Sequence, residues 1–167
     1  MKQFRILTTA LALGGALTVS SLAHAGAFRD AEAQIAAAYA DYRMALMKTN
    51  QKDKPGSEAA LFGFVAKWTA LANQWRTAPP PQYSDDTALG ATLDAVKKAA
   101  EDADVSLRQG DIAKSHDQLE IIRDQLSELR ARNGITSFSD RMNAYHAHME
   151  HVVSGAYDQF SAQGLIA

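Results

Sequence analysis

The densest group of chemically active side chains lies towards the C-terminal end, where three of the five histidines fall within six residues. Helical spacing would place Met142, His146 and Met149 on one face, with His148 and His151 on its flank. Thioether and imidazole groups suit copper, whereas imidazole with carboxylate suits zinc or iron. We therefore expect a transition-metal site here, with copper favoured. The alternative is that the methionines fill a core and the histidines are solvated or hydrogen bonded.

Two His-x-x-x-Glu pairs, His116 with Glu120 and His146 with Glu150, each place an imidazole and a carboxylate one helical turn apart. If the two segments form an antiparallel hairpin, Glu120 faces Glu150 and His146 faces Asp124. The two histidines are then separated by ~12 Å along the helices, too far for one ion. Two smaller metal sets remain, and each needs a ligand from a third helix: His146 with Asp124 and Glu150, or His116 with Glu120 and Glu150. A hydrogen-bonded ion pair between His146 and Asp124 is an equal alternative.

The chain contains no cysteine, which excludes disulfides, metal-thiolate sites, thiol catalysis and covalently attached haem of the C-x-x-C-H type. No Gly-x-Ser-x-Gly elbow and no phosphate-binding loop occurs in the sequence. With 17 basic against 19 acidic residues, nucleic acid is not an expected partner. These features favour a binding protein over an enzyme.

The first 25 residues have the pattern of a secretory signal peptide. Lys2 and Arg5 precede a moderately apolar run, and the small-x-small sequence 23–25 predicts cleavage before Gly26. The alternative is a membrane anchor, for which the apolar run is short, and no second such run follows. We expect residues 26–167 to form one domain in a bacterial periplasm, with no membrane association after cleavage.

Apolar residues recur at alternating spacings of three and four in five segments, which predicts five helices and no strands. The predicted helices cover residues 28–49, 57–77, 86–108, 111–132 and 138–160. Short connections favour an all-α, antiparallel helical bundle. Trp68 and Trp75 form an aromatic seam that we expect in the core, the alternative being the lining of a pocket for a flat cofactor or an apolar ligand.

Met44 and Met47 in the first helix after the leader, and Asn143-Ala144-Tyr145-His146 in the last, resemble the periplasmic four-helix-bundle cytochromes. The resemblance implies non-covalent haem b held by His146 and either Met44 or Met47. The fifth helix and the missing C-x-x-C-H motif depart from the b-type and cytochrome c-prime patterns, respectively. The alternative to any metal or haem is a metal-free bundle that binds a protein partner, an apolar small molecule or a second copy of itself.

Overall fold

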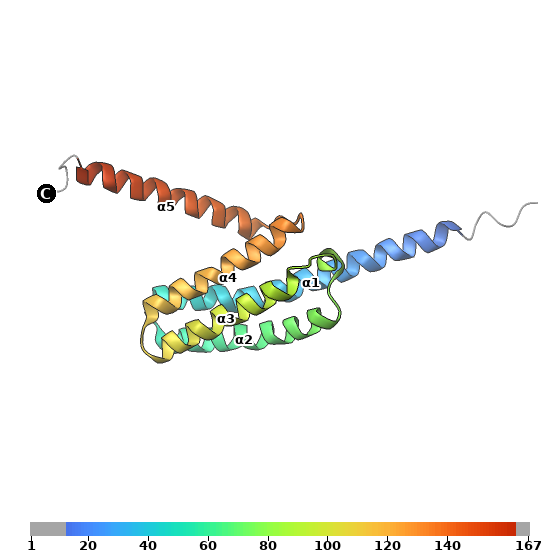
Figure 1. The fold of residues 1–167 in the computed structure, drawn as a ribbon, viewed down its shortest axis with the longest axis horizontal. Coiled ribbons are helices and arrows are strands. Elements are labelled where there is room, and N and C mark those ends of the chain that lie inside the picture. Colours follow the sequence, from blue (N-terminus) through green and yellow to red (C-terminus); the bar gives the residue numbers. More distant parts are fainter. Residues whose placement is uncertain (1–12, 163–167) are drawn as a thin grey trace, which may run out of the picture. The chain divides into compact units, whose positions relative to one another are not determined.

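The computed structural model describes residues 13–162, with the backbone alone for 13–24, 146, 147, 150, 154 and 157–162. The described residues contain helices and no strand, which confirms the all-α prediction. The elements are α1 (Leu13–Asn50), α2 (Lys54–Thr77), the 3-10 turn η1 (Pro81–Tyr83), α3 (Leu89–Arg108), α4 (Ile112–Arg132) and α5 (Phe138–Ala162) (Figure 1).

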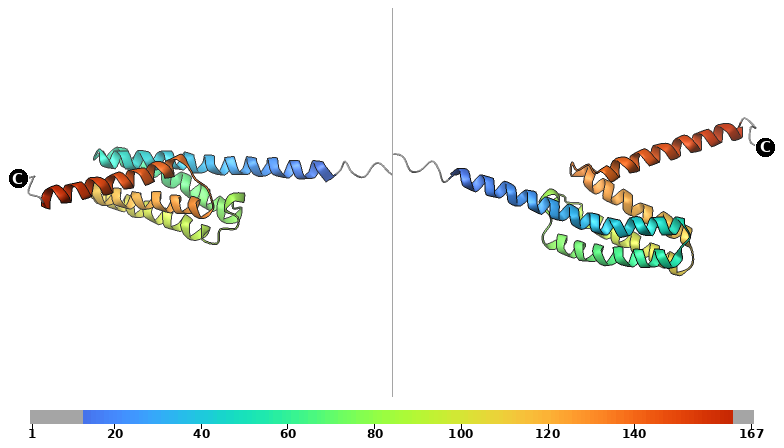
Figure 2. Two further views of the ribbon diagram at one scale, coloured as in Figure 1. Left: turned by 90° about the horizontal axis from the view of Figure 1, so that it is seen from above. Right: turned by 180° about the vertical axis from the view of Figure 1, so that it is seen from behind.

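The chain forms two compact units, one ending at Gln125 and the other beginning at Leu126. In the first unit, consecutive helices run antiparallel and form a bundle (Figure 2). Lys67 of α2 forms a salt bridge with Asp41 of α1, and the indole N–H of Trp68 donates a hydrogen bond to the carbonyl oxygen of Leu93 on α3. A hydrogen bond between Thr49 of α1 and the imidazole of His116 on α4 joins the last helix of the bundle to the first.

The core of this unit is built from apolar stripes in which the spacing alternates between four and three residues, the period of helices that pack as a left-handed bundle. Every member of the stripes on α1, α2 and α3 is buried, and α4 adds buried residues at the same spacing. The stripes are Ala31, Ile35, Ala38, Tyr42, Ala45 and Thr49 on α1; Ser57, Leu61, Phe64, Trp68, Leu71 and Trp75 on α2; Leu89, Leu93, Val96, Ala100, Ala103 and Leu107 on α3; and Ser115, Leu119 and Ile122 on α4.

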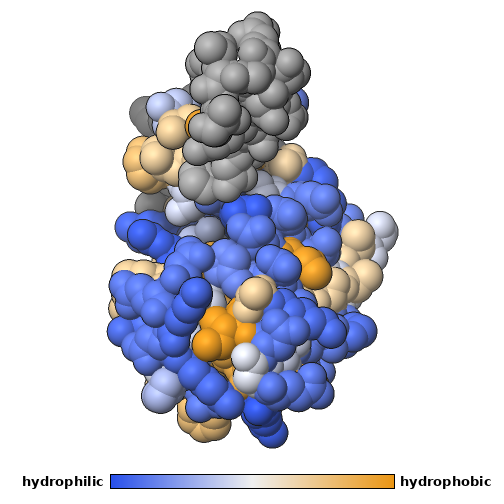
Figure 3. Space-filling model, turned by 90° about the vertical axis from the view of Figure 1, so that its left-hand side faces the viewer, coloured by the Kyte–Doolittle hydropathy of each residue, from blue (hydrophilic) through white to orange (hydrophobic). Residues whose placement is uncertain are grey.

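The outward sides of the helices are mainly polar, and the face shown in Figure 3 is mostly hydrophilic with small apolar areas. No helix within the described residues combines the length and the apolar character that a membrane crossing requires.

In the first unit, two helix ends use the same left-handed turn. Gly110 after α3 has φ +83°, and Lys52 after α1 has φ +56°. In each turn the next residue returns a hydrogen bond to a carbonyl five residues back: Asp111 to Ser106 at 2.9 Å, and Asp53 to Lys48 at 2.9 Å. This is the Schellman arrangement that satisfies the last carbonyl groups of a helix. Glycine occupies it without strain, whereas lysine at this position carries a backbone penalty.

Some helix starts differ from the sequence prediction. Helix α2 begins at Lys54 rather than near residue 57, because the Asp53 carboxylate accepts a hydrogen bond from the Gly56 amide and Pro55 fits the first turn. The hydrogen bond and charge of Lys48, with that Gly56 amide bond, hold the pKa of Asp53 below its usual range. Helix α1 is continuous from Leu13, so it includes part of the predicted leader.

The second unit contains the end of α4, a short turn and α5. Gly134, with φ +70°, ends α4 in a third left-handed turn, a position that glycine favours. Ser137 is the N-cap of α5: its hydroxyl accepts from the Asp140 amide, and the Asp140 carboxylate accepts from the Ser137 amide. Arg130 donates to Asp140 at 3.0 Å, with both side chains largely buried, so the start of α5 is firmly tied to α4.

Candidate functional site

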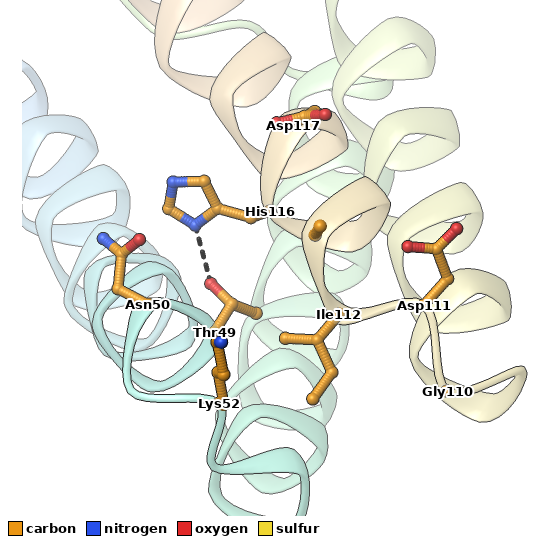
Figure 4. A pocket seen from close by; sticks show the side chains of 9 residues that line it. Thr49, Asn50, Lys52, Gly110, Asp111, Ile112, His116 and Asp117 are labelled. Atoms are coloured by element: carbon orange, nitrogen blue, oxygen red, sulfur yellow. Dashed lines mark hydrogen bonds between the residues drawn. The ribbon is translucent and has the colours of Figure 1, made fainter. Parts of the chain in front are cut away.

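His116 is the candidate ligand whose surroundings are described best. Its imidazole extends from α4 to the end of α1, where Nδ1 lies 2.8 Å from Thr49 Oγ1 (Figure 4). The Thr49 hydroxyl donates its one hydrogen to the carbonyl oxygen of Leu46 at 2.8 Å. Thr49 Oγ1 must therefore accept a hydrogen bond from Nδ1–H of His116. This assignment leaves the lone pair of the neutral imidazole on Nε2.

Metal-binding histidines usually donate one ring N–H to a neighbouring acceptor, which fixes the ring and leaves the lone pair of the other nitrogen for the metal. His116 has this arrangement, with Nδ1–H as the donor and Nε2 as the possible ligand atom. Glu120 Oε1 lies 4.0 Å from His116 Nε2, so the two side chains could bind one ion together. Arg123 already contacts the same carboxylate oxygen at 3.3 Å. Among the described residues, no three His, Asp or Glu side chains gather into a group that could hold a metal ion. The pair is therefore a half-site that would need ligands from elsewhere.

A cavity of about 500 Å³ opens beside His116, between the α1–α2 turn and the start of α4. Lys52, the residue with the left-handed backbone, lies at its edge. The lining contains an amide, a lysine and two carboxylates, so no single charge dominates it, and the rest of the accessible lining is mainly apolar. The polar side chains that line it are Thr49, Asn50, Lys52, Asp111, His116 and Asp117.

A second polar group lies along the same two helices. Arg123 donates to Asp124 at 3.2 Å as well as to Glu120. Partial burial alone would lower the pKa of Arg123, but the hydrogen bond that Arg123 donates to Asp124 and the negative charge of Glu120 raise it. Tyr42 is fully buried near this group, and its hydroxyl has no hydrogen-bond partner in the described part of the chain. Burial, reinforced by the nearby Tyr39, raises the pKa of Tyr42 far above its usual value.

Sequence reasoning did not single out Thr49, Arg123 or Tyr42 as neighbours of these candidate ligands. Thr49 and His116 are 67 residues apart in the sequence, and their contact forms only when α1 and α4 pack side by side. The one available signal was that Tyr42 and Thr49 share the buried stripe of α1, which would have placed both next to whichever helix covers that stripe.

The two methionines suggested by the cytochrome resemblance lie on the outer side of α1. Met44 is 45% exposed and Met47 42% exposed, whereas the buried stripe of α1 lies on the opposite side. Trp68 and Trp75 are buried as expected, and both indole N–H groups are bonded: Trp68 to the Leu93 carbonyl, and Trp75 to a side-chain amide oxygen of α1. The described interior of the first unit is thus occupied by aromatic and aliphatic side chains.

The candidate ligands on α5 belong to the second unit. Met142 is 46% exposed and Met149 45% exposed, and His148 and His151 are exposed. The side chains of His146 and Glu150 lie outside the described residues. Asp124, His116 and Glu120 belong to the first unit, so their combination with His146 or Glu150 stays a prediction.

Comparisons with protein-family models, with curated proteins and with solved structures give no match for this chain.

Proposed function

We propose that this chain is a periplasmic, non-enzymatic binding protein for a transition-metal ion, with copper favoured, and that its ligands are Met142, His146 and Met149 on α5. The observation that carries the proposal is the exposure of Met142 and Met149, whose exposed fractions are 46% and 45%. A methionine that serves only to fill a core is covered by its neighbours. Within the described residues, these two are open to an incoming ion.

The helix supplies a suitable spacing for these ligands. His146 follows Met142 by four residues and precedes Met149 by three, so the three positions share one face of α5. The two methionines are ~10 Å apart along the axis. Methionine has three rotatable side-chain bonds, which allow its sulfur to reach towards an ion near the middle position. Two thioethers and one imidazole form a soft ligand set, which favours Cu(I) over harder divalent ions.

Haem is the weaker form of this proposal. A haem inside the bundle would need an axial methionine that points inwards, and both Met44 and Met47 lie on the outer side of α1. The described core is also occupied by Trp68, Trp75 and Phe64, all at most 1% exposed.

Competition with a chromophoric Cu(I) chelator tests the proposal. Replacing Met142 and Met149 by leucine removes both sulfurs and retains apolar side chains of similar size. We expect this variant to bind Cu(I) at least tenfold more weakly than the wild type. The matched control replaces Met44 and Met47 by leucine, because these thioethers have nearly the same exposure. The proposal is wrong if the two double variants bind Cu(I) equally well.

The rival function, docking of an apolar partner without an ion, is favoured by the large apolar side chains exposed on the same helix. Phe138 is 79% and Val152 69% exposed. Replacing these two by serine keeps both thioethers and disrupts the apolar surface. Copper binding predicts that the serine variant, which keeps both methionines, binds Cu(I) more tightly than the leucine variant at Met142 and Met149. The rival predicts that these two variants bind Cu(I) equally weakly.

A further inference from the structure

Helix α5 carries an apolar stripe at the same alternating spacing as the core helices. The α5 stripe consists of Phe138, Met142, Tyr145, Met149, Val152 and Ala156. Its five large members are 79, 46, 60, 45 and 69% exposed, in chain order. The stripes of α1, α2 and α3 have the same length and spacing, yet all of their members are buried. In this chain, therefore, the pattern is one that packs against another helix.

A spacing of four and three residues averages 3.5 residues per turn, and it keeps a seam facing a partner helix over its whole length. The best partner carries a seam of the same period and a similar length. Within the first unit, the stripes of α1, α2 and α3 are already covered. Among the described helices, the one stripe of this kind with exposed members is that of α5 itself.

We propose that the α5 stripe packs against the α5 stripe of a second copy of this chain, forming a two-helix seam. Side chains of this size and exposure leave several hundred Å² of apolar surface on each copy. Two copies would together bury up to about 1,000 Å², close to the area that a specific interface requires. Such pairing also removes an apolar surface that a monomer in solution would otherwise expose to water.

The pairing rests on the stripe and not on the proposed copper site, so it forms in the metal-free protein. Met142 and Met149 are members of the stripe, and pairing brings thioethers of both copies to one seam. If the proposed function holds, the second helix that supplies further ligands is α5 of the other copy. In that case copper binding strengthens the dimer, because a ligand that binds one state preferentially stabilises it.

Sedimentation equilibrium of the chain in a metal chelator, over a range of protein concentrations, tests the pairing. We expect a dimer for the wild type and a monomer for Phe138→Glu. The matched control is Phe62→Glu, because Phe62 is 78% exposed on α2 and lies outside the stripe. This control remains a dimer. A wild type that stays monomeric, or a Phe138→Glu variant that dimerises as well as the control, overturns the proposal.

Disulfide mapping provides a second test, since the chain has no cysteine of its own. Cysteines placed together at Met142 and Val152 are ~15 Å apart along one helix and cannot bond within it. Both a parallel and an antiparallel seam place them within reach of the other copy. We expect oxidation to give disulfide-linked dimers, while a chain carrying Phe62→Cys forms no disulfide-linked dimer. Equal cross-linking of the two proteins overturns the pairing, and an unchanged far-UV circular dichroism spectrum verifies that each variant is folded.

Discussion

Replacing Tyr42 with phenylalanine is expected to leave the folded chain as stable as the wild type, or more stable by up to about 1 kcal/mol. The ring of Tyr42 is fully buried, and its hydroxyl has no hydrogen-bond partner among the described residues. A buried hydroxyl without a partner costs about 1–3 kcal/mol in lost hydration. Phenylalanine keeps the ring contacts with Tyr39 and Phe64 and removes this cost.

Tyr83 provides a matched comparison, because it is equally buried but its hydroxyl donates to Glu32 Oε1 at 3.1 Å. Tyr83→Phe removes a hydrogen bond to a charged acceptor and should lower the free energy of unfolding by about 1–2 kcal/mol. Urea unfolding at pH 7, followed by far-UV circular dichroism, measures both variants. The reasoning is refuted if Tyr42→Phe loses as much stability as Tyr83→Phe, because the Tyr42 hydroxyl would then have a partner.

Alkaline pH sharpens this comparison. Burial raises the pKa of Tyr42 in the folded chain, so the folded state keeps the phenol protonated while the unfolded state ionises near pH 10. The contribution of Tyr42 to stability is therefore complete below pH 10 and is lost as the pH rises further. Above pH 10, ionisation of this residue in the unfolded state should lower the free energy of unfolding of the wild type by about 1.4 kcal/mol per pH unit, and the Tyr42→Phe variant lacks this effect. The variant should gain on the wild type as the pH increases.

Three further predictions concern the turns, the His116 contact and processing. Lys52→Gly should stabilise the chain by about 0.5–1 kcal/mol, because Lys52 has φ +56°. Gly110→Ala should destabilise it by about 1 kcal/mol, because Gly110 has φ +83°, although no atom lies within 4 Å of the added Cβ. Thermal unfolding measures both variants, and a loss of stability for Lys52→Gly would contradict the strain argument. Thr49→Val should lower the free energy of unfolding by about 1 kcal/mol and remove the preference of His116 for the Nδ1–H tautomer, while Thr49→Ser retains the stability and the tautomer. An unchanged ¹⁵N spectrum of the His116 imidazole in Thr49→Val would contradict the assignment. The chain exported to a bacterial periplasm should have the mass of residues 26–167, and an uncleaved product would instead support the membrane-anchor alternative.

Much of the fold could be predicted because its determinants are local. The stripe that contains Trp68 and Trp75 predicted a helix, and the predicted ends at residues 108 and 132 agree with α3 and α4, which end just before Gly110 and Gly134. Local rules placed the start of α2 near Ser57, three residues late, because the cap is Asp53 and Pro55 is compatible with a first turn.

The contacts of the candidate site could not be predicted in the same way. The hydrogen bond between Thr49 and His116 joins residues that are adjacent only once α1 and α4 have packed together. The orphaned hydroxyl of Tyr42 is likewise a product of packing, since a tyrosine on an apolar stripe has no sequence signal for a missing partner. Exposure of the α5 stripe has the same origin, because periodicity identifies an apolar face and not what covers it.

X-ray absorption spectroscopy of the Cu(I)-loaded chain tests the proposed copper site most directly, because it identifies the atoms bound to the metal. The proposal predicts a first shell that contains sulfur at ~2.3 Å together with nitrogen at ~2.0 Å. Replacing Met142 and Met149 by leucine should remove the sulfur contribution, and replacing Met44 and Met47 should leave it unchanged. A first shell of nitrogen and oxygen alone in the wild type, or sulfur that persists in the Met142 and Met149 variant, would contradict the proposal.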